Sequence, residues 1–186
     1  MLCGHPFLYS RENVLQRCQD AGVDDVIAMS PKLQVLLEIL KKSAEEGKRT
    51  LVFSHFIGML DIMEFVVPTI EGINACRIDG KTSPKRLSLL VDEFNKPESI
   101  YNVMLMSIKT GGEGLTLTGA SKCVIYDPVW SQAESDQAVA RICRPGQTQE
   151  CESFCLIAAG TVEEKVRKRC KRCVSVMFSV QEVVTN

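Results

Sequence analysis

Five stretches of this sequence are short, largely apolar and free of the regular polar alternation that marks a half-buried strand. They lie at residues 50–56, 75–79, 103–108, 122–127 and 152–158. A strand that is apolar on both of its faces is typical of a parallel sheet buried between two layers of helices. Because helix-forming segments separate most of the five stretches, the pattern predicts a three-layer α/β fold. Its mostly parallel sheet is flanked by helices on both faces.

Two of the intervening helices carry the same start signal. Ser30-Pro31 and Ser83-Pro84 each place an N-capping serine before a proline at the first helical position. Further helices are expected over residues 57–67, 131–143 and 161–173. Ligands of parallel α/β sheets bind beyond the carboxyl ends of the strands. The expected binding loops are therefore those that follow four strand ends, at Ser54, Asp79, Ser107 and Asp127.

The bulk properties narrow the class of protein. A chain of 186 residues suits one well-cored domain, and no apolar run is long enough to span a membrane. The net charge is −1, although the basic run at 165–172 contributes +6. Such a run is typical of a solvated helix face and less often of a phosphate-binding patch. The nine cysteines are odd in number and several lie in apolar runs, which indicates reduced thiols in an intracellular compartment.

A zinc site is an alternative use for some of these cysteines. Cys151 and Cys155 form one closely spaced pair, and Cys170 and Cys173 form another. The first pair lies on an expected buried strand, whereas the ligands of structural zinc sites usually lie in turns. We therefore predict no metal site.

Two segments imitate parts of a nucleotide-binding site. Gly80-Lys81-Thr82 resembles the end of a phosphate-binding P-loop, but that motif needs a glycine where Ala75 stands, and the preceding residues are an expected strand. The stretch at 89–93 resembles a strand with a magnesium-binding acidic pair, yet its periodicity is helical. The sequence thus lacks both parts needed to hold magnesium-bound triphosphate.

Three segments instead have the composition of a site that contacts phosphate. Residues 107–120 follow an expected strand and place three glycines within four positions, which allows close approach of the backbone to a phosphate or ribose. Asp127-Pro128-Val129-Trp130 presents an aromatic residue at another strand end. Residues 137–147 carry Arg141 and Arg144, whose spacing would put both guanidinium groups on one face of a helix. Guanidinium binds phosphate oxygens bidentately, although an isolated pair of this spacing is usually a surface feature.

Taken in order, these segments resemble the second RecA-like lobe of Snf-type superfamily-two helicase-like ATPases, with a leaning toward the excision-repair-like subgroup. The resemblance covers most of the chain. Residues 51–55 are similar to motif IV, 79–86 to the segment after it, 107–120 to motif V and 137–147 to motif VI. It implies a lead-in from the first lobe at 1–29, a RecA-like helicase C-terminal lobe at 30–160, and a C-terminal charged helix and tail at 161–186.

The resemblance also implies residue roles. Arg141 and Arg144 would be catalytic arginine fingers that reach the γ-phosphate of ATP across an interlobe cleft. ATP-binding residues would be Gln137, Gly112, Glu113 and Gly114. DNA-binding residues would be Ser54, Thr82, Arg86, Ser107, Lys109, Thr110, Gly111 and Trp130. ATP with Mg²⁺ would be held mainly by the first lobe, which the resemblance places upstream, so the isolated chain is expected to be inactive.

The family also implies partners and a location. The expected partners are the backbone of double-stranded DNA, the first RecA-like lobe of the same polypeptide, and nucleosomes or DNA-bound proteins, with no membrane. The expected location is nuclear. Departures from the family pattern at Glu113, Ala140, Cys143 and Pro145 leave open a divergent, non-catalytic lobe that binds DNA or protein. The shared fold leaves open an RNA helicase lobe.

Overall fold

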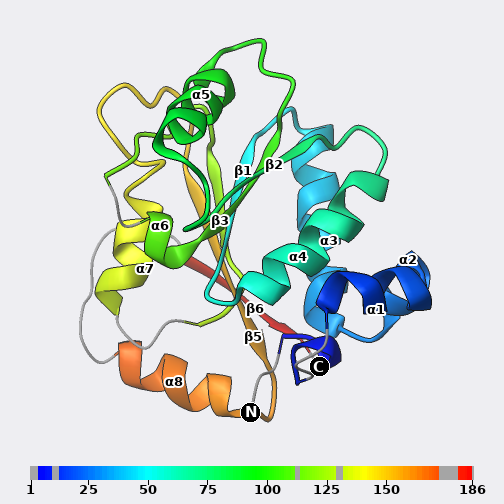
Figure 1. The fold of residues 1–186 in the computed structure, drawn as a ribbon. Coiled ribbons are helices and arrows are strands. Elements are labelled where there is room, and N and C mark those ends of the chain that lie inside the picture. Colours follow the sequence, from blue (N-terminus) through cyan, green and yellow to red (C-terminus); the bar gives the residue numbers. More distant parts are fainter. Residues whose placement is uncertain (1–3, 10–12, 112–113, 129–131, 172–179, 186) are drawn as a thin grey trace.

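A six-stranded, entirely parallel sheet forms the centre of the computed structural model, which describes residues 4–9, 13–111, 114–128, 132–171 and 180–185. Its order is β2-β3-β1-β4-β5-β6 (Figure 1). The strands are β1 Thr50–Ser54, β2 Ala75–Ile78, β3 Val103–Ser107, β4 Lys122–Ile125, β5 Glu152–Ala158 and β6 Val180–Thr185. The expected three-layer α/β fold is confirmed.

Helices cover both faces of this sheet (Figure 1). One side carries α3 and α4, with α1 and α2 beside them, and the other side carries α5, α6 and α7. The helices are η1 Pro6–Tyr9, α1 Val14–Ala21, α2 Val23–Ala28, α3 Pro31–Glu45, α4 Ile57–Val66, η2 Val67–Thr69, α5 Pro84–Asn95, α6 Ile108–Gly111, α7 Gln132–Val139 and α8 Val162–Lys171.

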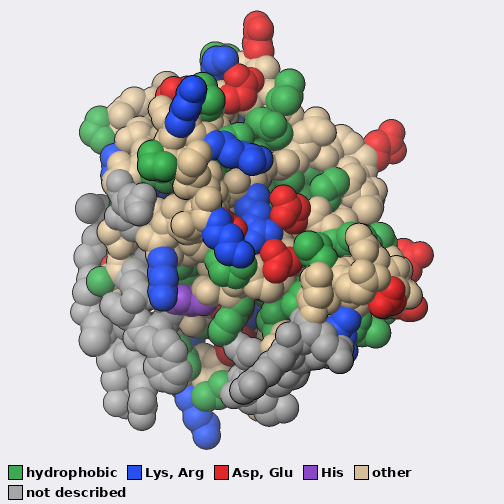
Figure 2. All heavy atoms as spheres, in the orientation of Figure 1, with side chains coloured by type: hydrophobic (Ala, Val, Ile, Leu, Met, Phe, Trp, Pro, Cys, Tyr) green, Lys and Arg blue, Asp and Glu red, His purple; other side chains and the backbone are tan. Residues whose placement is uncertain are grey.

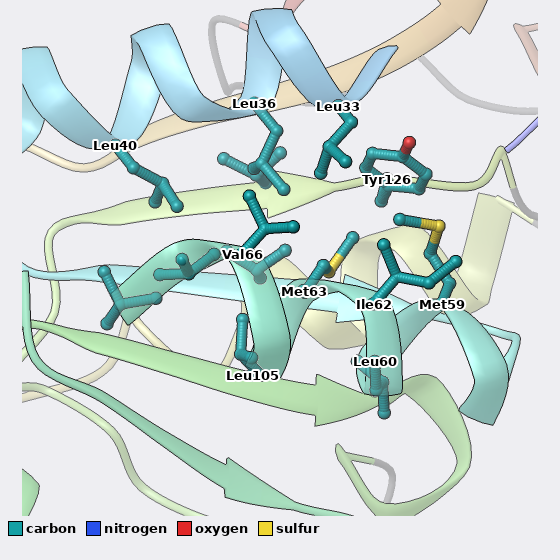
Figure 3. Packing of buried hydrophobic residues seen from close by; sticks show 14 of the residues in the cluster. Leu33, Leu36, Leu40, Met59, Leu60, Ile62, Met63, Val66, Leu105 and Tyr126 are labelled. Carbon is teal, nitrogen blue, oxygen red and sulfur yellow. The ribbon is translucent and has the colours of Figure 1, made fainter. Parts of the chain in front are cut away.

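The side chains of alternate strand residues pack into two separate hydrophobic cores, one on each face of the sheet. In β1, Val52 joins the core under α3 and α4, whereas Leu51 and Phe53 join the core under α5 and α7. Figure 3 shows the first core, in which leucines of α3 meet Met59, Ile62 and Met63 of α4 over the sheet. The continuous apolar runs in the sequence follow from this arrangement, because each strand face has its own layer of helices.

The helix starts that the sequence marks are confirmed. The side chain of Ser30 accepts a hydrogen bond from the backbone N–H of Leu33 at 3.3 Å, and α3 begins with Pro31. Ser83 caps α5 in the same way through the N–H of Arg86 at 3.4 Å. Asp92 and Glu93 lie within α5, as the helical interpretation of that stretch predicted.

The structure differs from the sequence prediction at three places. Residues 1–29 include helices α1 and α2 where only a lead-in was expected, and residues 161–186 end in strand β6, which extends the sheet beside β5. The third difference concerns α7, which ends at Val139 and not at residue 143. The backbone after Val139 folds into turns. The carbonyl of Arg141 accepts from the N–H of Leu117 at 3.1 Å, since its helical partner would be the nitrogen of Pro145, which carries no hydrogen.

A buried ion pair joins the last helix to the core. Lys32 on α3 is 2% exposed and donates to both carboxylate oxygens of Glu163 on α8, at 3.0 and 3.1 Å. Glu163 also accepts from the N–H of Ala158 at the end of β5, and the Lys32 ammonium lies 4.7 Å from the ring centroid of Tyr126. The helix predicted at 161–173 thus packs on the lobe. None of the described helices is long and apolar enough to cross a membrane.

Candidate nucleotide and DNA interface

The carboxyl ends of the parallel strands lie along one edge of the sheet, and polar side chains collect there. At the end of β1, the hydroxyl of Ser54 donates to the carboxylate of Asp127 at 2.5 Å, and the N–H of His55 donates to the same oxygen at 3.2 Å. Ser54 is fully buried. Its hydroxyl therefore joins two strand ends in this conformation, and its contact with DNA stays a prediction that would need this bond to open.

The end of β3 has a similar internal contact and one exposed cation. The hydroxyls of Ser107 and Thr110 lie 2.8 Å apart, and the N–H of Thr110 donates to Ser107 at 3.3 Å. Both residues are buried, whereas Lys109 between them is exposed on α6. Gly111 ends the same short helix. Of the predicted DNA-binding residues on this segment, Lys109 is the one whose charge faces solvent.

The end of β2 opens into a polar hollow of about 470 Å³. Arg86 and Lys81 line it beside Thr82, whose hydroxyl accepts from the N–H of Asp79 at 3.0 Å. Burial alone would raise the pKa of Asp79, but hydrogen bonds from the Lys81 N–H and the Arg77 guanidinium outweigh it, so its pKa is lowered. The predicted residues Thr82 and Arg86 thus share one site, where Lys81 and Arg86 line an open polar hollow.

Acidic side chains limit the positive charge of that edge. The guanidinium of Arg77 is bonded to Asp61 at 2.6 Å, to Glu64 at 2.8 Å and to Asp79 at 2.8 Å. Figure 2 shows the result, in which Lys and Arg side chains near the middle of the face lie beside Asp and Glu. Arg77 is therefore committed to carboxylates, which leaves Lys81 and Arg86 to attract a phosphate.

Arg141 and Arg144 lie in turns after α7, in a segment here named the arginine loop, residues 140–151. The expected placement of both on one helical face was wrong, because α7 ends at Val139. Arg141 is 3% exposed. Burial, and secondarily the positive charge of Arg144, lowers its pKa.

Arg144 is half-buried and is held by its own domain. Its Nε donates to the carbonyl of Ala140 at 3.1 Å, and its Nη1 donates to the hydroxyl of Thr116 at 2.8 Å. Thr116 belongs to the glycine-containing segment 107–120. The structure therefore brings two of the segments with phosphate-binding composition into direct contact, and Arg144 makes that contact.

Gln147 joins the same two segments from the other side. Its side-chain amide donates to three carbonyls, those of Ala120 at 2.7 Å, Thr118 at 3.2 Å and Ile142 at 3.2 Å. Its amide oxygen accepts from the N–H of Gln149 at 2.9 Å. Sequence reasoning placed Gln147 at the end of a motif and gave Thr116 no role. No local pattern reveals the bonds to Thr118 and Ala120, because these residues lie more than twenty positions from Gln147.

The remaining predicted residues fall into two groups. Gln137 is exposed on α7, and Gly114 is exposed with φ of +81°, a backbone conformation that favours glycine. Three others lie outside the described residues, namely Gly112, Glu113 and Trp130. Over the described part of the chain no group of three or more His, Cys, Asp or Glu side chains is arranged to hold a metal ion. The Gly80–Thr82 segment forms a turn closed by the Thr82 N–H on the Asp79 carbonyl.

Comparison with known proteins places this arrangement in a family. Residues 31–146 match the model of the helicase conserved C-terminal domain. The chain is 39% identical over 168 residues to the DNA excision repair protein CSB of Oryza sativa subsp. japonica, covering 90% of this chain and 14% of that protein. It is 36% identical over 167 residues to the ISWI chromatin-remodeling complex ATPase ISW1 of Saccharomyces cerevisiae, again covering 90% of this chain and 14% of the relative.

A solved structure agrees with the sequence relatives. The crystal structure of the C-terminal part of the Fun30 ATPase domain superposes with a TM-score of 0.77 at 28% identity, covering 88% of this chain and 55% of that one. The chain thus spans only a small part of the length of its curated relatives. Together with the six-stranded sheet and the arginine loop, these similarities show that the chain belongs to the helicase C-terminal domain family, as the second RecA-like lobe of Snf-type helicase-like ATPases.

Proposed function

We propose that this chain is the C-terminal motor lobe of an ATP-dependent translocase of double-stranded DNA, of the chromatin-remodelling or DNA-repair type. The observation that carries the proposal is the contact of Arg144 with Thr116, which sets a permanently charged guanidinium against the glycine-containing segment. Relatives named as a DNA excision repair protein and a chromatin-remodeling ATPase support DNA as the partner. They support a nuclear location in the same way.

In this proposal Arg144 is the residue that reaches ATP. It lies at the surface of the lobe, whereas Arg141 is buried beside it. When the two lobes close, Arg144 would give up its hydrogen bonds to Thr116 and Ala140 and bind the γ-phosphate held by the first lobe. A positive charge there stabilises the transition state of phosphoryl transfer, an effect of roughly 10³–10⁵ in rate in other NTPases. In this proposal Arg141 does not contact ATP, and its buried charge adds to the positive electrostatic potential of the arginine loop.

In this proposal the first lobe would supply the nucleotide cradle and would hold Mg²⁺, whose charge would offset that of the triphosphate. The residues of this lobe are consistent with a role that complements the first lobe. They include two guanidinium groups and the exposed Gln137, but the described residues contain no cluster of metal-binding side chains. In this proposal DNA is contacted by Lys109, and by Arg86 and Thr82 in the polar hollow at the end of β2. Such contacts grip the backbone without reading base sequence.

The test is turnover of the full-length parent protein. Arg144→Ala should abolish most of its duplex-DNA-stimulated ATP hydrolysis, and Arg144→Lys should restore little, because a lysine lacks the forked donor set. Lys41→Ala, which removes one positive charge from an exposed site on α3, is the matched control. Near-normal turnover of Arg144→Ala would overturn the finger role.

The burial of Arg141 favours a second candidate, a lobe that binds DNA or protein without contributing to hydrolysis. In that case Arg144→Ala would leave turnover intact, while replacing Lys109 or Arg86 would still weaken DNA binding. Stimulation of the parent by single-stranded RNA in place of duplex DNA would instead select an RNA helicase.

A further inference from the structure

Arg77 lies on β2, the strand at one edge of the sheet, and its guanidinium is surrounded by carboxylates. Its strand neighbours Cys76 and Ile78 pack into the core under α5 and α7. Because successive strand residues face opposite ways, Arg77 points to the other side, where α4 packs beside β2 (Figure 1). Two residues of α4, Asp61 and Glu64, meet the guanidinium there. The proposed motor function gives this arginine no contact of its own with DNA.

The carboxylates take up most of the hydrogen-bonding capacity of Arg77. Its Nη1 donates to Asp61 at 2.6 Å and to Glu64 at 2.8 Å, and its Nε donates to Asp79 at 3.0 Å. The same oxygen of Asp79 lies 2.8 Å from Nη2. A guanidinium has five N–H donors in a fixed geometry, so Arg77 could bind a phosphate bidentately only by giving up a carboxylate. Its side chain is also only 15% exposed.

Asp79 links Arg77 to the turn that forms one wall of the polar hollow. One carboxylate oxygen of Asp79 accepts from Arg77, and the other accepts from the backbone N–H of Lys81 at 2.9 Å. The backbone of Asp79 binds Thr82 twice: its N–H donates to the Thr82 hydroxyl at 3.0 Å, and its carbonyl accepts from the Thr82 N–H at 2.9 Å. Arg77 therefore holds the residue around which Lys81 and Thr82 are arranged.

Positive and negative side chains are balanced around this hollow. The charged residues that line it are Glu64, Arg77, Asp79, Lys81 and Arg86. Asp61 adjoins them through its bond to Arg77, so three carboxylates stand against three cationic groups. Without the charge of Arg77 the carboxylates would outnumber Lys81 and Arg86. The attraction of the hollow for a phosphate therefore depends on an arginine that is itself turned toward carboxylates.

The carboxylates do not form a metal site. Over the described part of the chain no group of three or more His, Cys, Asp or Glu side chains is arranged to hold a metal ion. The guanidinium of Arg77 is bonded to Asp61, Glu64 and Asp79 together. It already supplies the positive charge that a metal ion would bring.

We propose that Arg77 is a positioning residue for DNA binding in the polar hollow, where Lys81, Thr82 and Arg86 hold a phosphate of the duplex. Arg77 does not touch the phosphate. It holds Asp79, and with it the turn at 79–82, and it offsets the carboxylates of α4, which would otherwise repel the phosphate. The inference rests on the proposed function, because it requires that the hollow contacts DNA.

The test is equilibrium binding of a fluorescently labelled DNA duplex to the full-length parent protein, measured by anisotropy. Arg77→Met should weaken binding roughly three- to tenfold, an effect in the range of one unit charge acting across a partly solvated surface. Arg49→Met is the matched control, because Arg49 precedes β1 at the opposite edge of the sheet and its guanidinium donates to the Phe94 carbonyl at 2.7 Å. It also removes an internally bonded arginine, but it should leave DNA binding unchanged.

Removal of the α4 carboxylates supplies the converse test. Glu64→Gln should tighten DNA binding several-fold, and it should leave the fold intact because the Glu64 side chain is 54% exposed. The variant that combines Arg77→Met with Asp61→Asn and Glu64→Gln should recover most of the affinity that Arg77→Met loses. Urea unfolding identifies a variant that fails to fold, and Glu64→Gln then decides. A Glu64→Gln protein that binds DNA no more tightly than the parent would overturn the proposal.

The salt dependence of binding distinguishes a positioning residue from one that contacts DNA. Each phosphate contact that is lost reduces the slope of log affinity against log salt by about one. Arg86→Ala should show that reduction, whereas Arg77→Met should weaken binding with a slope close to that of the parent. A slope for Arg77→Met that falls as it does for Arg86→Ala would make Arg77 a direct phosphate ligand and contradict the positioning role.

Failure of this inference can be told from failure of the proposed function. If Arg86→Ala binds DNA as tightly as the parent, the hollow is not a DNA site, and the proposed DNA contact fails together with the inference. If Arg86→Ala weakens binding and Arg77→Met does not, the inference alone is wrong. Neither result depends on Arg144, because the measurement involves no ATP hydrolysis.

Discussion

The guanidinium of Arg144 donates to the hydroxyl of Thr116 across 2.8 Å, although the two residues are 28 positions apart in the chain. Thr116 lies in the glycine-containing segment after β3, and Arg144 lies in the arginine loop after α7. The contact joins the two segments that most resemble motifs V and VI. It also holds the proposed finger in a defined place while no second lobe is bound.

Replacing Thr116 with valine should lower DNA-stimulated ATP hydrolysis of the parent protein. Valine preserves the shape of threonine but removes the acceptor, so Arg144 loses its hydrogen bond to Thr116, keeps the one to the Ala140 carbonyl, and samples more conformations. The fall should be several-fold, smaller than that of Arg144→Ala. Thr118→Val is the matched control, since Thr118 offers its backbone carbonyl to Gln147 and keeps it in the variant. Equal rates for the two valine variants would show that Thr116 does not position Arg144.

Gln147→Leu should destabilise the lobe by about 1–3 kcal/mol, because buried carbonyls lose their donor. The three carbonyls belong to Thr118, Ala120 and Ile142. Urea unfolding of the purified chain measures the change. Gln149→Leu, at an exposed site two residues away, should shift the midpoint much less. A Gln147 variant as stable as that control would mean that water replaces the lost bonds.

Lys32→Met should destabilise the chain by about 3–5 kcal/mol, because it leaves the carboxylate of Glu163 buried without its cation. The exposed pair of Lys96 and Glu93, whose atoms lie 2.7 Å apart, supplies the contrast, and Lys96→Met should cost less than about 1 kcal/mol. The double variant Lys32→Met with Glu163→Leu should recover part of the loss. A double variant worse than Lys32→Met would indicate that the bond from Glu163 to the Ala158 N–H matters more than the ion pair.

Stability should fall as the pH drops below about 6.5, the ordinary pKa of histidine, and His5 should cause part of that fall. Burial lowers the pKa of His5, the charge of Arg17 lowers it further, and the hydrogen bond to Val26 opposes both. Its Nε2 donates to the Val26 carbonyl at 2.8 Å and its Nδ1 accepts from the Phe7 N–H at 3.1 Å. Both nitrogens are thus used by the neutral ring.

The direction in which stability changes with pH follows from the linkage between proton binding and folding. Because the folded state binds the proton of His5 less tightly than the unfolded state, the stabilising contribution is complete above the unfolded pKa and declines as the pH falls toward the folded pKa. His5→Gln removes the titration, so its urea midpoint should change less between about pH 7.5 and pH 5.5 than that of the natural chain. Parallel curves for the two proteins would contradict a role for His5. Asp79 and Glu46 do not interfere, since their pKa values are lowered from values already near 4.

The sequence by itself determined the features that depend on neighbours along the chain. The apolar runs at 50–56 and 103–108 specify strands with two covered faces, and the serine–proline pairs specify where α3 and α5 begin. The order of the motifs was enough to identify the family. The strand β6 escaped prediction because it is stabilised by pairing with β5, a partner that lies more than twenty residues earlier.

Only the tertiary structure decided how the proposed site is built. Helical spacing suggested that Arg141 and Arg144 point the same way, but α7 ends at Val139, and the Arg141 carbonyl pairs with the N–H of Leu117. One arginine is buried and the other is held by Thr116. Such contacts depend on how separate strands and loops pack against one another. No local sequence pattern predicts that packing, because the residues that meet are far apart in the chain.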